Sequence, residues 1–434
     1  DLMSDLIGIC YKYCPDNPAS IETVQQIFQT QGFNSFLINC IAAYTLPKYL
    51  RMKGDIDTGT ENNVFYQRAL FLLNNENVTL RDKLLGMMFL ISFEVDYKDP
   101  WLVSIRCKKF EAMCYEAKLN TLDAYQDLQL KEYDLNTCEM RNVWYCYLIN
   151  EIIYTANTLT PMKVEFNPEN VYLPHPNFNF TPTKMNPRKI LNSTIIEVIS
   201  TSPYEIHTNF NSMARLIWLN QAFIPVLNLY SKFLNTKLGF ERMLIVNEIL
   251  NSLELVQYYF YKFDLKTYEQ NVLKNPSYYG TTSQLSALII FHHSNVFYHL
   301  LLAKFYTELK QFDLAKKYRS NGKIYANELL KFTKRTLKLP NCSLPDLDLT
   351  LLYLNCPWIP TAIVQTSRIY IPVSSASDLQ NLQYVVEFCR FYSYFNEKLK
   401  SYVEWCESQI STNGNWTLVQ KLKVTEIEMF LDEI

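Results

Sequence analysis

Apolar residues recur at three- and four-residue steps along most of this chain, and this spacing restricts the fold more than any other feature. In residues 139–154, for example, Met140, Trp144 and Tyr147 would share one buried face of a helix. The only short β-branched run, residues 367–373, contains a proline, which cannot donate a ladder hydrogen bond. The sequence therefore predicts an all-α fold, a multi-helical array of long amphipathic helices with no significant β-sheet.

A proline-rich connector separates two helical halves. Residues 160–187 are the one long stretch without helical spacing, and loops of this length are usually functional or flexible. We therefore expect an N-terminal helical part, residues 1–159, and a C-terminal helical part, residues 188–434, that packs on the first. The predicted helices cover residues 2–13, 21–30, 33–51, 63–73, 79–95, 100–119, 136–157, 209–234, 241–263, 282–309, 312–337, 348–371 and 379–411.

Composition argues against several classes of function. Nine glycines in 434 residues leave little material for phosphate-cradling loops, and neither G-x-G-x-x-G nor G-x-x-x-x-G-K-S/T occurs. A net charge of −2 lacks the basic footprint of a domain that holds DNA by itself. The longest apolar runs, residues 36–46 and 84–91, are too short to span a bilayer, so no membrane association is expected.

The cysteines and histidines do not form a recognisable metal or catalytic motif. Eleven cysteines, an odd number, lie mostly within apolar helical patterns, which favours a reducing compartment. His292 and His299 would share one helix face, but no second pair of ligands accompanies them, so we interpret them as packing residues. No nucleophile elbow or Cys-His signature appears. We predict no catalytic residue, no metal site and no cofactor; an unrecognised helical enzyme is the minor alternative.

A helix expected from Asp99-Pro100 to about residue 119 precedes the segment 139–154. Aspartate followed by proline suits a helix start. We expect its inner face to carry five residues: Trp101, Ile105, Ala112, Tyr115 and Leu119.

The order of these elements resembles the regulatory middle region of fungal zinc-cluster transcription factors. In that family a Trp-containing helix precedes an acidic-Arg-Arg-x-Trp-Trp helix, a Gly-Arg-Pro turn and a short Leu-Pro segment. Glu139, Arg141 and Trp144 match the second helix, Pro161 matches the turn, and residues 173–174 match the last segment.

The match covers roughly the first 175 residues and departs from the family pattern in three places. Tyr145 stands for the second aromatic residue, and Asn150 stands where the family often has aspartate. The turn lacks its glycine and arginine.

The resemblance implies a nuclear regulator that forms a homo- or heterodimer and contacts DNA through an N-terminal zinc module. That module is absent from this chain, and zinc is implied for it alone; because the chain begins at Asp1 without a methionine, we expect a fragment. The present domain would restrain or release activity through coactivator or repressor proteins, or through a small apolar ligand. The alternative function is a scaffold or dimerisation subunit of a chromatin-remodelling or centromere DNA-binding complex.

Residues 304–338 have the most one-sided charge in the chain, with ten basic residues against three acidic ones. Such a segment could contact DNA phosphates or an acidic partner. Lys316, Lys317 and Arg319 are the candidate basic surface. The solvated face of two amphipathic helices is the more common explanation of such a pattern.

Overall fold

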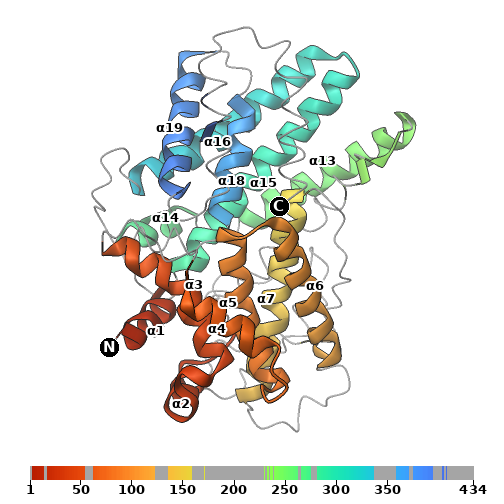
Figure 1. Ribbon diagram of the computed structural model, residues 1–434. Helices are drawn as coiled ribbons and strands as arrows, with labels where there is room; N and C mark the ends of the chain where they lie inside the picture. The colour runs from red at the N-terminus through yellow and green to blue at the C-terminus, as the bar shows by residue number, and fades with distance from the viewer. Residues whose placement is uncertain are drawn as a thin grey trace. The chain divides into compact units, whose positions relative to one another are not determined.

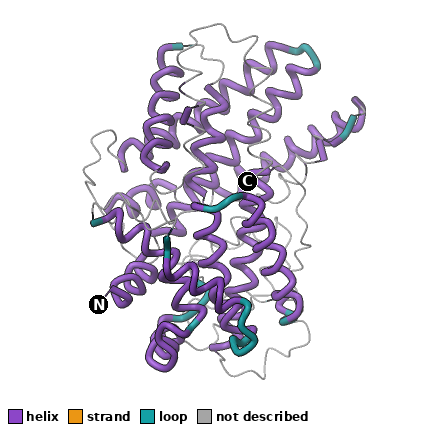
Figure 2. Tube along the Cα trace, in the orientation of Figure 1, coloured by secondary structure: helices purple, strands orange, loops and turns teal. Residues whose placement is uncertain are grey.

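The computed structural model is built from helices. It describes residues 2–13, 17–53, 62–122, 135–158, 171, 229, 232–233, 235–237, 239–261, 265–274, 281–336, 358–370, 375–393, 403–404 and 407. Over these residues the structure has helices and no strand, as Figures 1 and 2 show, which confirms the all-α prediction. None of the described helices is both long and apolar enough to cross a membrane.

By its internal contacts the chain divides into two compact units. The first comprises Asp1–Asn150 with Val164–Ile217, and the second comprises Glu151–Lys163 with Trp218–Ile434. The predicted connector, residues 160–187, lies outside the described residues except for Val171.

The first unit is organised around α3, which packs against α1, α4 and α5, while α5 also packs against α6 (Figure 1). The approach of α3 and α5 is close, because a Cβ on Gly86 would lie 2.7 Å from the Phe36 ring. The helices are α1 (Leu2–Tyr13), α2 (Ile21–Gln31), α3 (Phe36–Met52), α4 (Val64–Leu73), α5 (Leu80–Tyr97) and α6 (Pro100–Glu116), together with α7 (Leu135–Thr158) as far as Asn150.

Short polar side chains begin three of these helices. The Ser20 hydroxyl accepts the Thr23 N–H at 3.0 Å, and the Asn63 amide oxygen accepts the Tyr66 N–H at 3.0 Å. Thr79 does the same for the N–H of Asp82, at 3.2 Å. Each bond satisfies an amide that has no partner inside its own helix, so the starts of α2, α4 and α5 are encoded locally.

In the second unit α15 is the central helix and packs against α13, α14, α16 and α18. A cap with Lys310 in the left-handed region (φ 58°) joins α15 to α16, and the Gln311 N–H returns to the Tyr306 carbonyl at 2.9 Å. The elements are α13 (Gly239–Tyr261), α14 (Leu265–Lys274), α15 (Thr281–Glu308), α16 (Phe312–Thr336), α18 (Trp358–Ser367), the 3₁₀ turn η3 (Arg368–Tyr370) and α19 (Ala376–Ser393).

Most predicted helices agree with the structure to within a few residues, but the separate helix α14 was not predicted. Its ten residues carry apolar side chains on only one narrow face, with Tyr268 and Val272 buried. Parts of the predicted helices at 209–234, 348–371 and 379–411 lie outside the described residues.

Candidate functional site

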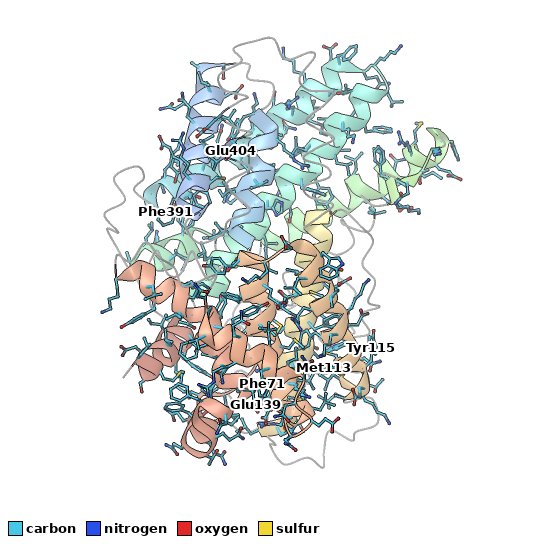
Figure 3. All side chains as sticks on the ribbon, viewed as in Figure 1. Phe71, Met113, Tyr115, Glu139, Phe391 and Glu404 are labelled. Atoms are coloured by element: carbon cyan, nitrogen blue, oxygen red, sulfur yellow. The ribbon has the colours of Figure 1, made fainter. Side chains whose placement is uncertain are left out.

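Glu139, the acidic residue of the family-like motif, lies at a junction of three helices. Its side chain is 0% exposed and comes from α7 (Figure 3). One carboxylate oxygen accepts the backbone N–H of Ser20 at 2.9 Å. Because Ser20 is the N-cap of α2, Glu139 takes the part that a glutamate within α2 itself would have in a capping box.

The other carboxylate oxygen of Glu139 forms an ion pair with Arg81 in the first turn of α5. The Arg81 Nε donates to the amide oxygen of Asn136, one turn before Glu139 on α7, at 2.6 Å. A buried carboxylate is tolerated only when its charge is paired and its oxygens are hydrogen-bonded, and both conditions are met here. Glu139 thus ties α2 and α5 to α7.

The aromatic residues of the motif also turn inward. Trp144 is buried and packs against Tyr115 and Tyr147, with ring centroids 6.1 Å and 5.5 Å apart. Tyr145, fully buried, donates its hydroxyl to the Val171 carbonyl at 2.8 Å. The residue at the family's second aromatic position therefore contacts the segment that leads to the Leu-Pro element.

The other matched positions are not brought to this junction as buried residues. Arg141 is half-buried on α7, and Pro161 lies outside the described residues. Trp101 is 73% exposed, and Ile105, Ala112 and Tyr115 are exposed with it, so the prediction that they form the inner face of α6 was wrong. Only Leu119, beyond the end of α6, is buried as expected.

The opposite face of α6 is buried, and it carries a charged residue that has a partner. Arg106 donates its Nε to both carboxylate oxygens of Glu94 on α5, at 3.0 Å and 3.1 Å, and its Nη2 to one of them at 2.9 Å. The Tyr66 hydroxyl of α4 donates to the same carboxylate at 3.0 Å. Val103, Phe110, Met113 and Cys114 lie on this buried side.

The surroundings of this pair change the acidities of its neighbours. Burial lowers the pKa of Arg106, but its hydrogen bonds and attraction to Glu94 outweigh that and leave the pKa raised. Burial, reinforced by the Glu94 charge, raises the pKa of the Tyr66 hydroxyl. The Cys40 thiol of α3 has a raised pKa for the same reasons. These groups stay in the forms that stabilise the core, and none is poised for proton transfer at neutral pH.

The three predicted basic-surface residues of α16 separate into two kinds. Lys316 and Lys317 are exposed. Arg319 is partly buried and donates its Nε to the Ile369 carbonyl and its Nη2 to the Arg368 carbonyl, both at 3.2 Å. Arg319 therefore holds η3 against α16 and is committed to the fold.

A basic cleft that the sequence did not reveal lies at the other end of α16. It is an open cleft of about 420 Å³ between α16 and α19, and the described residues that line it are Asn327, Lys331, Lys334, Arg335, Ser377 and Asn381. The concentration of charge in residues 304–338 was a signal for the lysines and the arginine. Nothing in the sequence indicated that α19 would supply the opposite wall.

The histidines of α15 lie in an aromatic stack. His299 lies between Tyr318 and Tyr325 of α16, with centroids 6.1 Å and 5.7 Å away, and Tyr318 in turn stacks on Tyr306 at 5.3 Å. Burial lowers the pKa of His299 to about 4. Within the described residues, no group of three His, Cys, Asp or Glu side chains is placed to hold a metal ion.

Comparisons with known proteins identify no relative of this chain. No protein-family model, curated protein or solved structure matches this chain. Inferences about function therefore depend on the residues and contacts described above and on the resemblance in the motif region.

Proposed function

We propose that this chain is the regulatory domain of a fungal zinc-cluster transcription regulator and that it acts in the nucleus by binding other molecules. The position of Glu139 is the main support. In the resembled motif this residue is the leading acid, and here it joins α2, α5 and α7 through its two oxygens. Trp144 and Tyr145 connect further segments to the same helix. A motif that specifies a domain's fold is expected to have such contacts.

The use of the ionisable groups favours binding over catalysis. Glu94 and Glu139 each form an ion pair with an arginine, and His299 is enclosed between two tyrosine rings. Catalytic acids and bases need access to a substrate and pKa values near the working pH. Lys331, Lys334 and Arg335 of the α16–α19 cleft keep accessible charges in a concave site, and their chemistry is suited to holding a ligand.

The proposal is tested on the full-length product of the gene that encodes this chain. We expect it to contain zinc bound by a cluster of six cysteines and to bind duplex DNA, measured by metal analysis and by fluorescence anisotropy. The 434-residue chain is the matched control and should bind the duplex far more weakly, because its net charge is −2. An intact product without zinc and without DNA affinity would rule the proposal out.

The scaffold alternative is favoured by the exposed apolar side chains of α6. Trp101, Ile105 and Tyr115 lie on one helix face, and protein contacts often cover such faces. The mass in solution, measured by light scattering with and without metabolite mixtures, separates the two functions. A constitutive dimer whose melting temperature no metabolite changes indicates a scaffold, whereas stabilisation by a metabolite indicates an effector-binding regulator.

A further inference from the structure

We infer that the cleft between α16 and α19 binds a small organic anion with two or more negative charges on phosphate or carboxylate groups. This inference names a class of effector and so rests on the proposed function. Binding of the anion can be tested independently of that function. The open cleft has a volume of about 420 Å³, which is enough for a small ligand. None of the six described residues that line it is acidic, and three are cationic.

The three cations come from one face of α16. Lys331, Lys334 and Arg335 are separated by three and four residues, the spacing that places helical side chains side by side. Lys331 contacts Glu328 at 3.3 Å and Arg335 pairs with Glu269, but Lys331 is 55% exposed and Arg335 is 49% exposed. Pairs this exposed are weak, so a multiply charged ligand can compete for both side chains.

Lys334 is the most informative of the three. It is half-buried, its ammonium donates to the Asn381 amide oxygen at 3.1 Å, and it lies 4.8 Å from the centre of the Tyr384 ring. Burial lowers its pKa, opposed by the charge of Glu387. Its hydrogen bond to Asn381 and its ring contact with Tyr384 are to neutral groups, and the opposing charge of Glu387 does not outweigh burial, so the partly desolvated ammonium would gain from an anion in the cleft.

The amide groups of the cleft have their acceptors engaged inside the protein. The Asn327 oxygen accepts the Tyr370 hydroxyl at 2.8 Å and the Asn381 amide at 2.9 Å. The Asn381 oxygen accepts Lys334. An amide oxygen has two lone pairs, so that of Asn327 is saturated and its NH₂ group remains to donate. The polar lining therefore offers mainly donors, which an anion requires.

The start of α19 adds to the same polarity. The Ser375 hydroxyl caps the helix by accepting the Asp378 N–H at 3.1 Å, and Ser377 lines the cleft one residue earlier. The first N–H groups of a helix lack intrahelical partners and carry partial positive charge. Asp378 does not oppose this, because it is buried and paired with Lys323 at 2.7 Å.

A small ligand suits the cleft better than the backbone of duplex DNA, which presents the same phosphate chemistry. The positive residues are gathered in a concave space between two helices, and the chain as a whole carries a charge of −2. A DNA-binding face would require positive charge spread along a surface that follows the phosphates.

Calorimetric titration of the 434-residue chain with pyrophosphate and with citrate, at constant ionic strength, tests the inference. We expect a dissociation constant below about 1 mM for at least one of them. Lys334→Met retains the side-chain stem on Tyr384 but removes the charge, and should raise that constant by about tenfold or more. Lys317→Met is the matched control, because it removes the same charge from an exposed site on α16 and should leave binding unchanged.

Ser377→Asp is a second variant, and it tests the cleft independently of whether the fold tolerates a substitution at Lys334. An acidic residue in the first turn of α19 favours the helix, so the fold should persist while the added charge repels the ligand. Binding of pyrophosphate alone identifies phosphate as the recognised group, and binding of citrate alone identifies clustered carboxylates.

The inference is overturned by any of three results. One is the absence of heat and of a melting shift up to about 10 mM of either probe. Another is equal weakening by Lys334→Met and Lys317→Met, which would show general charge screening. The third is binding of duplex DNA through these residues without binding of the small anions. All three are independent of the zinc and DNA measurements on the intact product, so either proposal can fail alone.

Discussion

The two units differ in the polar groups at their centres. In the first unit Glu94 and Glu139 are buried as charges, each paired with an arginine. The second unit also has a buried ion pair, Asp378 with Lys323, but its central helix α15 packs His299 as a neutral ring between Tyr318 and Tyr325. The first core therefore depends on charges that remain complementary, and the stack in the second depends on a histidine that remains uncharged.

This difference changes which perturbation each unit resists. Removing one member of a buried ion pair leaves the other charge desolvated. Adding a proton to a buried histidine creates a charge in a place that has no compensating partner. Hydrogen exchange resolved by peptide can follow α5–α6 and α15–α16 separately, so the first two predictions below have a readout in both units.

The largest expected effect is that of Arg106→Met in the first unit. Methionine fills a similar volume but leaves Glu94, which is 0% exposed, without its bidentate partner. The free energy of unfolding of this unit should fall by about 3–5 kcal/mol. Chemical denaturation and exchange in α5–α6 measure the loss, and protection in α15–α16 should change little.

Two further variants make this prediction sharper. Lys108→Met, an exposed position on α6, is the control and should change stability by less than about 0.5 kcal/mol. Glu94→Leu combined with Arg106→Met should recover much of the lost stability, because both charges are then gone. If Arg106→Met is as mild as the control, the first unit does not depend on this pair.

Acid should act mainly on the second unit. The pKa of His299 is about 4 in the fold because of burial, against about 6.5 in an unfolded chain. Between these values the unfolded chain binds a proton that the folded chain does not, so stability is present at pH 7 and is lost as the pH falls toward 4. At pH 5 the loss from this residue should be about 2 kcal/mol.

Exchange in α15–α16, corrected for the intrinsic effect of pH, measures this loss. His299→Phe keeps a ring between Tyr318 and Tyr325 but cannot bind the proton, so its exchange should be less acid-sensitive. His292, with its pKa also lowered by burial to about 4, would account for part of the remaining sensitivity. Acid sensitivity of α15–α16 that His299→Phe leaves unchanged would contradict this prediction.

These contrasts also show what the sequence could and could not predict. Helical spacing and local caps, such as Thr79 before Asp82, depend on neighbouring residues and predicted the fold class and most helix limits. The buried face of α6 was missed because apolar residues occupy both faces. The face containing Arg106 is selected by Glu94, a residue of a different helix.

The two candidate sites differ in the same respect. Glu139 was identified by a local motif, but its contact with Ser20 joins positions 119 apart in sequence. The α16–α19 cleft depends on Asn381 meeting Asn327 and Lys334 from a separate helix. Packing between distant helices, which periodicity does not encode, determined both the buried face of α6 and the α16–α19 cleft.

A smaller effect is expected at the contact of α2 with α7. Ser20→Ala removes the hydroxyl that caps α2 but keeps the backbone N–H that Glu139 accepts, so stability should fall by about 1 kcal/mol. Thr79→Ala is the control, because it removes a comparable cap from α5 at a position that is exposed. Urea midpoints of both variants measure the difference, and a loss at Ser20 smaller than at Thr79 would argue against a special role for this junction.

The smallest expected effect is that of Trp101→Ser, and it contrasts with the effect of substituting Trp144, the other tryptophan of the family-like region. Trp101→Ser should change the free energy of unfolding by less than about 0.5 kcal/mol, because the indole is 73% exposed. Trp144→Ala, at a buried ring between Tyr115 and Tyr147, should cost about 3–5 kcal/mol. A costly Trp101→Ser would mean that the α6 stripe is covered in solution, and concentration-dependent stability would identify a second copy of the chain as the cover. A neutral result leaves Glu139 and Trp144, and not Trp101, as the motif positions that stabilise the first unit.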